Sequence, residues 1–241
     1  MKRILLLGTG GTIVSWRGES GLEPKNRTRD ILDAMSSSYP DCSFEAHDLM
    51  SLDSSNIQPE HWRLIAQKVF RSLDSFDGIV ITHGTDTLEE TAFFLSLVLP
   101  ATRPVLLTGA MRPASALSAD GPGNLYDACR FALAARQAGI GGVFVSFGGR
   151  VLRADAVYKQ HANRTDAFAQ RFGQPVAWLE ADQPCWQQPL PSGMGLRGQF
   201  AALPMMQTAP TPASRTQTAI SGTQVPAGTQ QAETGPLSGD A

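Results

Sequence analysis

The sequence predicts an α/β fold in which a parallel-rich sheet is flanked by helices on both faces. Short, almost continuously apolar runs, typical of strands buried on both sides, recur at residues 3–7, 78–82, 104–107 and 143–145. Between these runs, apolar residues recur every three or four positions, as they do along one face of a helix. Strands and helices that alternate in this way are typical of βαβ units, whose strands pair in parallel.

The elements of the first half each carry a local signal. A glycine-rich loop follows the strand at 3–7, and the pattern then predicts a short helix at 29–35 and a weakly alternating strand at 43–49. Pro59 suits the first turn of a helix, where a backbone N–H is not needed. The apolar residues after it form one helix face; they are Trp62, Ile65, Ala66, Val69, Phe70 and Leu73.

The second half continues the alternation. A helix from about 88 to 99 is expected after the strand at 78–82. Asp120 is expected to cap the following helix, and Gly139 to end it. This helix lies between the apolar runs at 104–107 and 143–145, which completes another strand–helix–strand unit.

The chain is expected to consist of three segments. Residues 1–178 are expected to form one folded α/β domain. Residues 179–204 are expected to be irregular, because Pro184, Pro189 and Pro191 discourage regular structure. Residues 205–241 contain no aromatic residue and are rich in Thr, Gln, Ala and Pro. Such a segment buries too little apolar surface to offset the cost of ordering it, which predicts a disordered tail.

Composition excludes several classes of protein. The 241 residues carry a net charge of −2 and give a pI of about 6.1, which argues against nucleic-acid binding. No apolar run is long enough to cross a membrane, and the first strand is too short for a secretory signal, so a cytoplasmic protein is expected. The scattered Cys42, Cys129 and Cys185 fit neither a disulfide framework nor a zinc site. Neither a metal nor a cofactor is expected.

Two motifs carry the chemical signal. Residues 8–13 read GTGGTI and residues 83–87 read HGTDT, and each follows an apolar strand. Each motif therefore places a threonine hydroxyl just past the carboxyl end of a strand, where ligands bind in open α/β sheets. Two such threonines, one beside an aspartate, suggest a hydrolase with a threonine nucleophile.

Each motif also has a structural interpretation. The first begins like the dinucleotide fingerprint G-x-G-x-x-G, but Ile13 stands where the third glycine belongs, and no helix signal follows. The second, taken alone, is also consistent with a strand-to-helix turn capped by Asp86 or Thr87. The pairing of the two motifs in one chain favours the catalytic interpretation.

The motifs resemble those of the bacterial L-asparaginase family, of the cytoplasmic kind. Residues 9–13 and 83–92 are similar to its two signatures, and residues 53–57 resemble its substrate-binding turn. Residues 108–113 and 118–125 resemble two further stretches of that family. The similarity runs to about residue 173 and implies a fold like the asparaginase N-terminal domain.

The resemblance implies roles for particular residues. Thr12 is the implied nucleophile, assisted by a second group of Thr85, Asp86 and Lys159. The implied substrate-binding residues are Asp53, Ser54, Ser55, Thr85 and Asp86. A tyrosine that relatives carry on the loop after the first motif is replaced by Leu22 here.

The resemblance further implies a function and an assembly. The implied reaction is hydrolysis of L-asparagine to aspartate and ammonia, with L-glutamine as a second candidate substrate. No nucleic acid or membrane partner is implied, and a homo-oligomer is expected if assembly does not need the missing part. Relatives carry a smaller C-terminal α/β domain, and the break in composition near residue 179 suggests that this chain is truncated.

Three alternatives stand beside this function. The first is a truncated, non-catalytic relative that retains only amino-acid binding or the fold. A dinucleotide-binding domain is the second, and the missing third glycine counts against it. The third is the amidohydrolase subunit of a tRNA-dependent amidotransferase, whose members carry an additional N-terminal domain.

Overall fold

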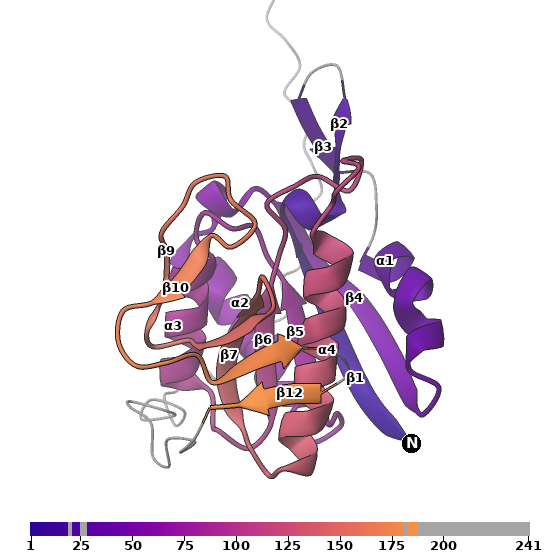
Figure 1. Ribbon diagram of the computed structural model, residues 1–241, viewed down its shortest axis with the longest axis vertical. Coiled ribbons are helices and arrows are strands. Elements are labelled where there is room, and N and C mark those ends of the chain that lie inside the picture. The colour runs from indigo at the N-terminus through magenta and orange to yellow at the C-terminus, as the bar shows by residue number, and fades with distance from the viewer. Residues whose placement is uncertain (19–20, 25–27, 181–182, 188–241) are drawn as a thin grey trace, which may run out of the picture. The chain divides into compact units, whose positions relative to one another are not determined.

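The main sheet contains both parallel and antiparallel strands (Figure 1). The computed structural model describes residues 1–18, 21–24, 28–180 and 183–187. Within these residues the strands of the main sheet are β1 (Lys2–Gly10), β4 (Cys42–Leu52), β5 (Gly78–Thr82), β6 (Pro104–Thr108), β7 (Gly142–Phe147), β8 (Arg150–Arg153), β11 (Ala177–Glu180) and β12 (Gln183–Trp186). Their order across the sheet is β12-β11-β8-β7-β6-β5-β1-β4.

In the order across the sheet, the five strands β4, β1, β5, β6 and β7 each run parallel to their neighbours in this group. The strands β8, β11 and β12 extend the sheet in antiparallel fashion beyond β7. Each parallel connection needs a crossover, and helices supply most of these crossovers. The predicted parallel-rich sheet with helices on both faces is therefore confirmed.

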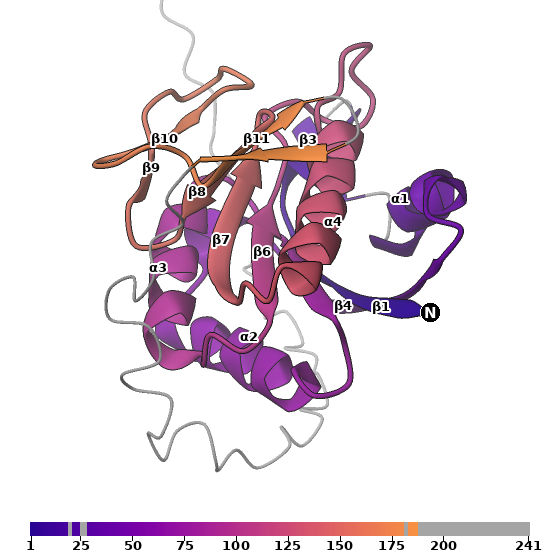
Figure 2. The same ribbon diagram turned by 60° about the horizontal axis from the view of Figure 1, so that its bottom comes forward.

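The helices lie on both faces of the sheet. They are α1 (Thr28–Met35), α2 (Pro59–Ser72), α3 (Leu88–Val98) and α4 (Gly121–Gln137). Figure 2 shows α3 and α2 on one side of β6 and β7, with α4 on the other. The short 3-10 helices are η1 (Thr12–Val14), η2 (Ser36–Ser38) and η3 (Ser54–Asn56). Two small antiparallel sheets complete the described elements. One pairs β2 (Ser15–Gly18) with β3 (Gly21–Pro24), and the other pairs β9 (Val157–Lys159) with β10 (Phe168–Gln170).

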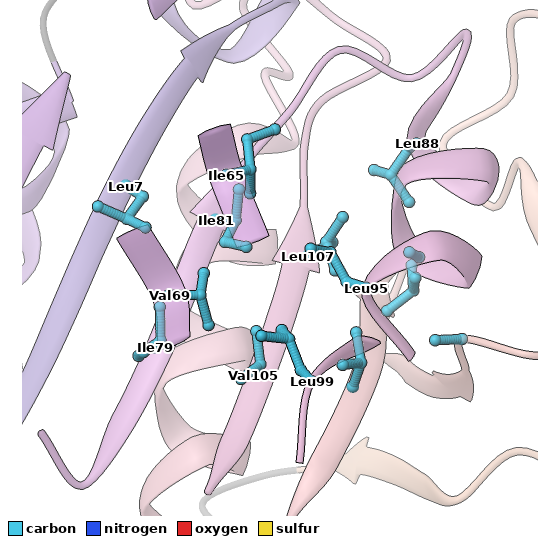
Figure 3. Packing of buried hydrophobic residues seen from close by; sticks show 14 of the residues in the cluster. Leu7, Ile65, Val69, Ile79, Ile81, Leu88, Leu95, Leu99, Val105 and Leu107 are labelled. Carbon is cyan, nitrogen blue, oxygen red and sulfur yellow. The ribbon is translucent and has the colours of Figure 1, made fainter. Parts of the chain in front are cut away.

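Side chains of the central strands alternate between two cores. On β1, Leu5 and Leu7 pack in the cluster under α2 and α3, whereas Ile4 and Leu6 pack in the cluster under α4 and α1. The strands β5, β6 and β7 alternate in the same way. Figure 3 shows part of the first cluster, with Leu107 of β6 between the strands and α3. Because both faces are covered, these strands are apolar throughout rather than at every second residue.

Two details differ from the sequence prediction. Asp120 stands at the N-cap of α4, but its side chain makes no capping hydrogen bond. It accepts instead from the backbone N–H groups of Met111 and Arg112, so it braces the preceding loop. Within the segment expected to be irregular, β12 pairs with β11 even though it contains Pro184. The strand lies at the end of the strand order, and an edge strand tolerates proline because one side of its backbone needs no partner.

The predicted disordered tail at 205–241 lies outside the described residues. Among the helices that the structure describes, none is long and apolar enough to cross a membrane.

Two leucines of opposite exposure should respond differently to truncation. Leu107 is fully buried on β6, and Leu117 is fully exposed in the loop before α4. We expect Leu107→Ala to lower the free energy of unfolding by about 2–5 kcal/mol, because it leaves a cavity in the core. Leu117→Ala, which removes the same atoms, should change it by less than about 0.5 kcal/mol. Urea denaturation of both variants measures the difference, and equal losses would contradict the assigned core.

Candidate active site

Three loops meet at the carboxyl edge of the sheet, after the adjacent parallel strands β4, β1 and β5. Two glycines allow these loops to touch. A Cβ added at Gly11 would lie 2.6 Å from the backbone N of Gly84, and a Cβ added at Gly84 would lie 2.6 Å from Ser54 Oγ. Both distances are shorter than real Cβ contacts, so larger residues would push the loops apart. Gly11 also has a φ of 86°, which suits glycine alone among common residues.

The loops enclose a small cavity of about 140 Å³. Five of the predicted site residues line it: Thr12, Asp53, Ser54, Thr85 and Asp86. The remaining two predicted site residues contact the lining residues from behind. Ser55 is hydrogen-bonded to Asp53. Lys159 is hydrogen-bonded to Thr85 and Asp86. The cavity is well below the roughly 300–1,000 Å³ of drug-sized sites, so it suits a small ligand. Its lining also includes Ser15 and Ser51, which sequence reasoning did not identify.

Lys159 joins the second motif to a distant strand. Its ammonium, on β9, donates to Thr85 Oγ1 at 2.9 Å and to Asp86 Oδ1 at 2.7 Å. The Lys159 side chain is only 17% exposed, whereas that of Asp86 is 63% exposed. An ammonium can only donate, so the Thr85 oxygen accepts and its own proton is left for another acceptor. The pair thus offers a route by which a proton can pass between the cavity wall and Lys159.

Thr12 begins η1, directly after the Gly10–Gly11 turn at the end of β1. Among the side chains that the structure describes, none is hydrogen-bonded to the Thr12 hydroxyl. The neighbouring Ser15 hydroxyl instead donates to the Gly11 carbonyl at 2.9 Å, which braces the turn. Leu22, which stands where relatives carry a tyrosine, lies on β3 opposite Arg17, and its side chain is outside the described part.

The turn of η3 is tied to the second motif by hydrogen bonds. Ser54 Oγ accepts from the backbone N–H of Asp86 at 3.2 Å, and the Ser54 carbonyl accepts from Thr87 Oγ1 at 2.7 Å. Thr87 therefore stands at the N-cap of α3 without capping it through its side chain. The backbone and hydroxyl of Ser55 both donate to Asp53, which lowers the pKa of that carboxyl. Asp53 is accordingly a carboxylate at neutral pH.

A buried chain of hydrogen bonds ends at the second motif, and sequence reasoning missed it. Trp62 Nε1 donates to Thr91 Oγ1 at 2.9 Å, Thr91 Oγ1 lies 3.0 Å from His83 Nε2, and His83 Nδ1 lies 2.7 Å from the Gly84 carbonyl. A carbonyl only accepts, so His83 Nδ1 carries a proton. Burial lowers the pKa of His83, which favours the neutral imidazole at neutral pH. In that form Nε2 has no proton, so it accepts from the Thr91 hydroxyl.

In the described part of the chain, no group of three or more His, Cys, Asp or Glu side chains is arranged to hold a metal ion.

Comparison with known proteins gives a consistent result. Residues 3–191 match the family model described as asparaginase, N-terminal. The probable L-asparaginase of Deinococcus radiodurans is 42% identical over 168 residues, which are 70% of this chain and 51% of that protein. The L-asparaginase of Thermococcus kodakarensis is 38% identical over 183 residues, 75% of this chain and 55% of that protein. The chain thus spans about half the length of the curated relatives it matches.

Solved structures show the same similarity. The probable cytoplasmic L-asparaginase from Campylobacter jejuni superposes with a TM-score of 0.72 at 33% identity, over 78% of this chain and 59% of that one. The thermostable L-asparaginase from Thermococcus kodakarensis gives a TM-score of 0.70 at 36% identity, over 80% of this chain and 58% of that one.

The His83 chain predicts a pH dependence of stability. Unfolding returns the lowered pKa of His83 toward its ordinary value of 6.5, so the unfolded state binds more protons just below that pH. The stability contributed by neutral His83 is complete above pH 6.5 and is lost as the pH falls toward the lower pKa of the folded state. The slope is at most about 1.4 kcal/mol per pH unit.

Denaturation between pH 7.5 and pH 5 tests this dependence against His83→Asn. The asparagine amide can replace the Nδ1 donor but does not titrate in this range. We expect a shallower pH dependence in the variant, and identical slopes would contradict the assignment of a buried neutral imidazole.

Proposed function

The chain belongs to the asparaginase family, and from this we propose that it hydrolyses L-asparagine to aspartate and ammonia through a Thr12 nucleophile. The observation that carries the proposal is the small cavity lined by Thr12, Thr85 and Asp86, with Lys159 bonded to Thr85 and Asp86. The names of the relatives support the same reaction. They do not favour the non-catalytic alternative.

In the proposed reaction, the Thr12 oxygen attacks the side-chain amide carbon of asparagine. The C–N bond then breaks, ammonia leaves with an added proton, and an ester links the substrate acyl group to Thr12. Water attacks this ester, which releases aspartate and restores the Thr12 hydroxyl. A hydroxyl is a weak nucleophile and needs a partner that takes its proton. The Thr85–Lys159 hydrogen bond supports such a proton route. The Lys159 ammonium would pass a proton through Thr85 to the departing amide nitrogen, and the neutral amine that results would take up the proton that Thr12 gives away.

The charged ends of the substrate have candidate partners. The Asp86 carboxylate lines the cavity and is suited to bind the α-ammonium of asparagine. Asp53, held ionised by Ser55, offers a second negative charge for the same group. Ser54 lines the cavity, and its hydroxyl is suited to the α-carboxylate. The Ser55 hydroxyl donates to Asp53, so Ser55 would contribute to substrate binding through that carboxylate. A small, mainly polar cavity agrees with an amino acid as ligand, and L-glutamine is the second candidate.

Two broader features belong to this proposal. The similarity to a probable cytoplasmic enzyme supports a cytoplasmic location. We also propose a homo-oligomer, in keeping with the assembly that the family resemblance implies. Size-exclusion chromatography with light scattering tests it, and a monomer that hydrolyses asparagine would contradict it.

Replacing the proposed nucleophile should abolish the reaction. We expect Thr12→Ala to lower the rate of ammonia release from L-asparagine by roughly 10³-fold or more, because no covalent ester can form. Thr12→Ser, which keeps the hydroxyl, is the matched control and should retain measurable turnover. Thermal melts should be alike for all three proteins. Unchanged turnover in Thr12→Ala would refute the nucleophile, and asparagine binding without any turnover in the wild type would favour the non-catalytic alternative.

Asp86 and Lys159 should affect different steps. Asp86→Asn replaces a charge-assisted contact with a neutral one, so we expect substrate binding to weaken by about 1.5–3 kcal/mol. Lys159→Met removes the proton carrier and should mainly lower kcat. Steady-state kinetics with L-asparagine, beside calorimetric binding of L-aspartate, separates the two effects. If both variants changed only the melting temperature, the two residues would form a structural ion pair and nothing more.

A further inference from the structure

Lys159 is held at both ends by one short stretch of the chain. Its ammonium is bonded to Thr85 and Asp86, and its backbone N–H donates to Glu89 Oε2 in the first turn of α3. We propose that Glu89 is a positioning residue that determines where the Lys159 ammonium lies relative to Thr85. The proposal rests on the proposed function, in which that ammonium takes part in proton transfer.

The strand that carries Lys159 needs an external anchor. β9 and β10 have three residues each, and among the strands that the structure describes they pair only with one another, from Phe168 opposite Lys159 to Gln170 opposite Val157. A two-stranded sheet of this size is barely stable in isolation. Figure 1 shows the pair beside α3, away from the central strands of the main sheet. The location of Lys159 therefore depends on contacts between this hairpin and its neighbours.

Apolar packing anchors the hairpin but does not fix its register. Val157 and Phe168 are buried in the cluster that also contains Leu88 of α3. Hydrophobic contact is non-directional, so it permits small shifts of the hairpin along the helix. A hydrogen bond to a charged acceptor is directional and is stronger than a neutral one. Two such directional bonds are present: the Lys159 N–H bond to Glu89 constrains β9, and the bond from the Arg153 N–H to Gln170 Oε1 constrains β10. The bond to Glu89 is the one made by Lys159 itself.

Glu89 contacts β9 and the residue that follows β10. Its second oxygen lies 3.6 Å from Arg171 Nη2, and Arg171 directly follows β10. The Arg171 guanidinium also lies over the Tyr158 ring, 5.0 Å from its centroid. One carboxylate thus connects the backbone of β9 with the side chain that follows β10. The Glu89 side chain is 24% exposed, which limits the competition from water for these bonds.

The place of Glu89 in α3 links this anchor to the cavity. An acidic residue in the first turn of a helix is stabilised by the partial positive charge at the helix N-terminus. The same turn follows directly on Thr85 and Asp86, so one rigid segment sets both partners of the Lys159 ammonium and the anchor of its backbone. Glu90, next along the helix, is exposed and provides a control of equal charge.

Kinetics of three variants test the proposal in the full chain. We expect Glu89→Ala to lower kcat by about 10–100-fold, the range that a small misplacement of a catalytic group produces, with little change in KM. Glu89→Gln keeps an acceptor for the Lys159 N–H and should lose only about fivefold. Glu90→Ala should match the wild type. A fall in kcat as large in Glu90→Ala as in Glu89→Ala would overturn the proposal.

A double variant separates positioning from a general structural role. If Glu89 acts through Lys159, then Glu89→Ala combined with Lys159→Met should be no slower than Lys159→Met alone. Multiplied effects in the double variant would show that Glu89 acts independently, and the proposal would fail. Urea denaturation of Glu89→Gln and Glu89→Ala confirms that each variant is folded before its kinetics are compared.

A readout without turnover distinguishes failure of this proposal from failure of the proposed function. The chain contains four lysines, so selective ¹⁵N-lysine labelling gives at most four backbone amide signals. The signal of Lys159 is assigned by its loss in Lys159→Met. In Glu89→Ala this signal should move upfield and exchange with solvent about tenfold faster, while it should be unchanged in Glu90→Ala. An unaltered Lys159 signal in Glu89→Ala would overturn the positioning role even if the wild type released no ammonia.

Discussion

The close approach of the Gly11 and Gly84 backbones is the constraint on which the candidate site depends. Parallel pairing of β1 with β5 brings the two strand ends side by side, but it does not by itself bring the following loops into contact. That contact exists because Gly11 has no side chain to hold the two loops apart, and the missing side chain of Gly84 leaves room for Ser54 of the third loop. Thr12 and Thr85, each the next residue in its loop, can then line one cavity.

The core and the site are held by different kinds of interaction. Alternating side chains of β1, β5, β6 and β7 fill two apolar cores and fix the sheet between its helices. The loops above the sheet are fixed by directional bonds, such as those of Ser54 with Asp86 and Thr87. Loss of apolar contact therefore lowers stability throughout the domain, whereas loss of one loop bond changes local geometry and leaves the sheet intact.

Much of the sheet could be predicted because the information is local. Runs such as 78–82 and 104–107 are apolar on both faces, and the helix after Pro59 has a regular stripe. The strands β9 and β12 could not be predicted, because three or four residues carry too little pattern. In addition, the proline in β12 argues against a strand unless one knows that β12 lies at the edge of the sheet. Asp120 was expected to cap α4, because an N-cap residue and a loop brace look alike in sequence.

The candidate site also combines residues that local sequence predicts with residues that only the packing of the fold reveals. Its two threonines follow apolar strands directly, so the sequence alone places them at the sheet edge, and their chemical roles remain predictions. Glu89 contacts Lys159 across 70 positions, and His83 contacts Thr91 and, through it, Trp62. No periodicity or motif spacing encodes such contacts, because they depend on how separate elements pack.

The position of β1 inside the sheet has a consequence for biosynthesis. Its parallel neighbours β4 and β5 end at residues 52 and 82, so β1 is synthesised well before either partner exists. At about 5–20 residues per second, the apolar run at 4–7 waits several seconds on the ribosome without a strand to pair with. Until one of these partners is complete, β1 keeps apolar side chains and backbone groups unpaired, the features that make a partly synthesised chain prone to aggregation.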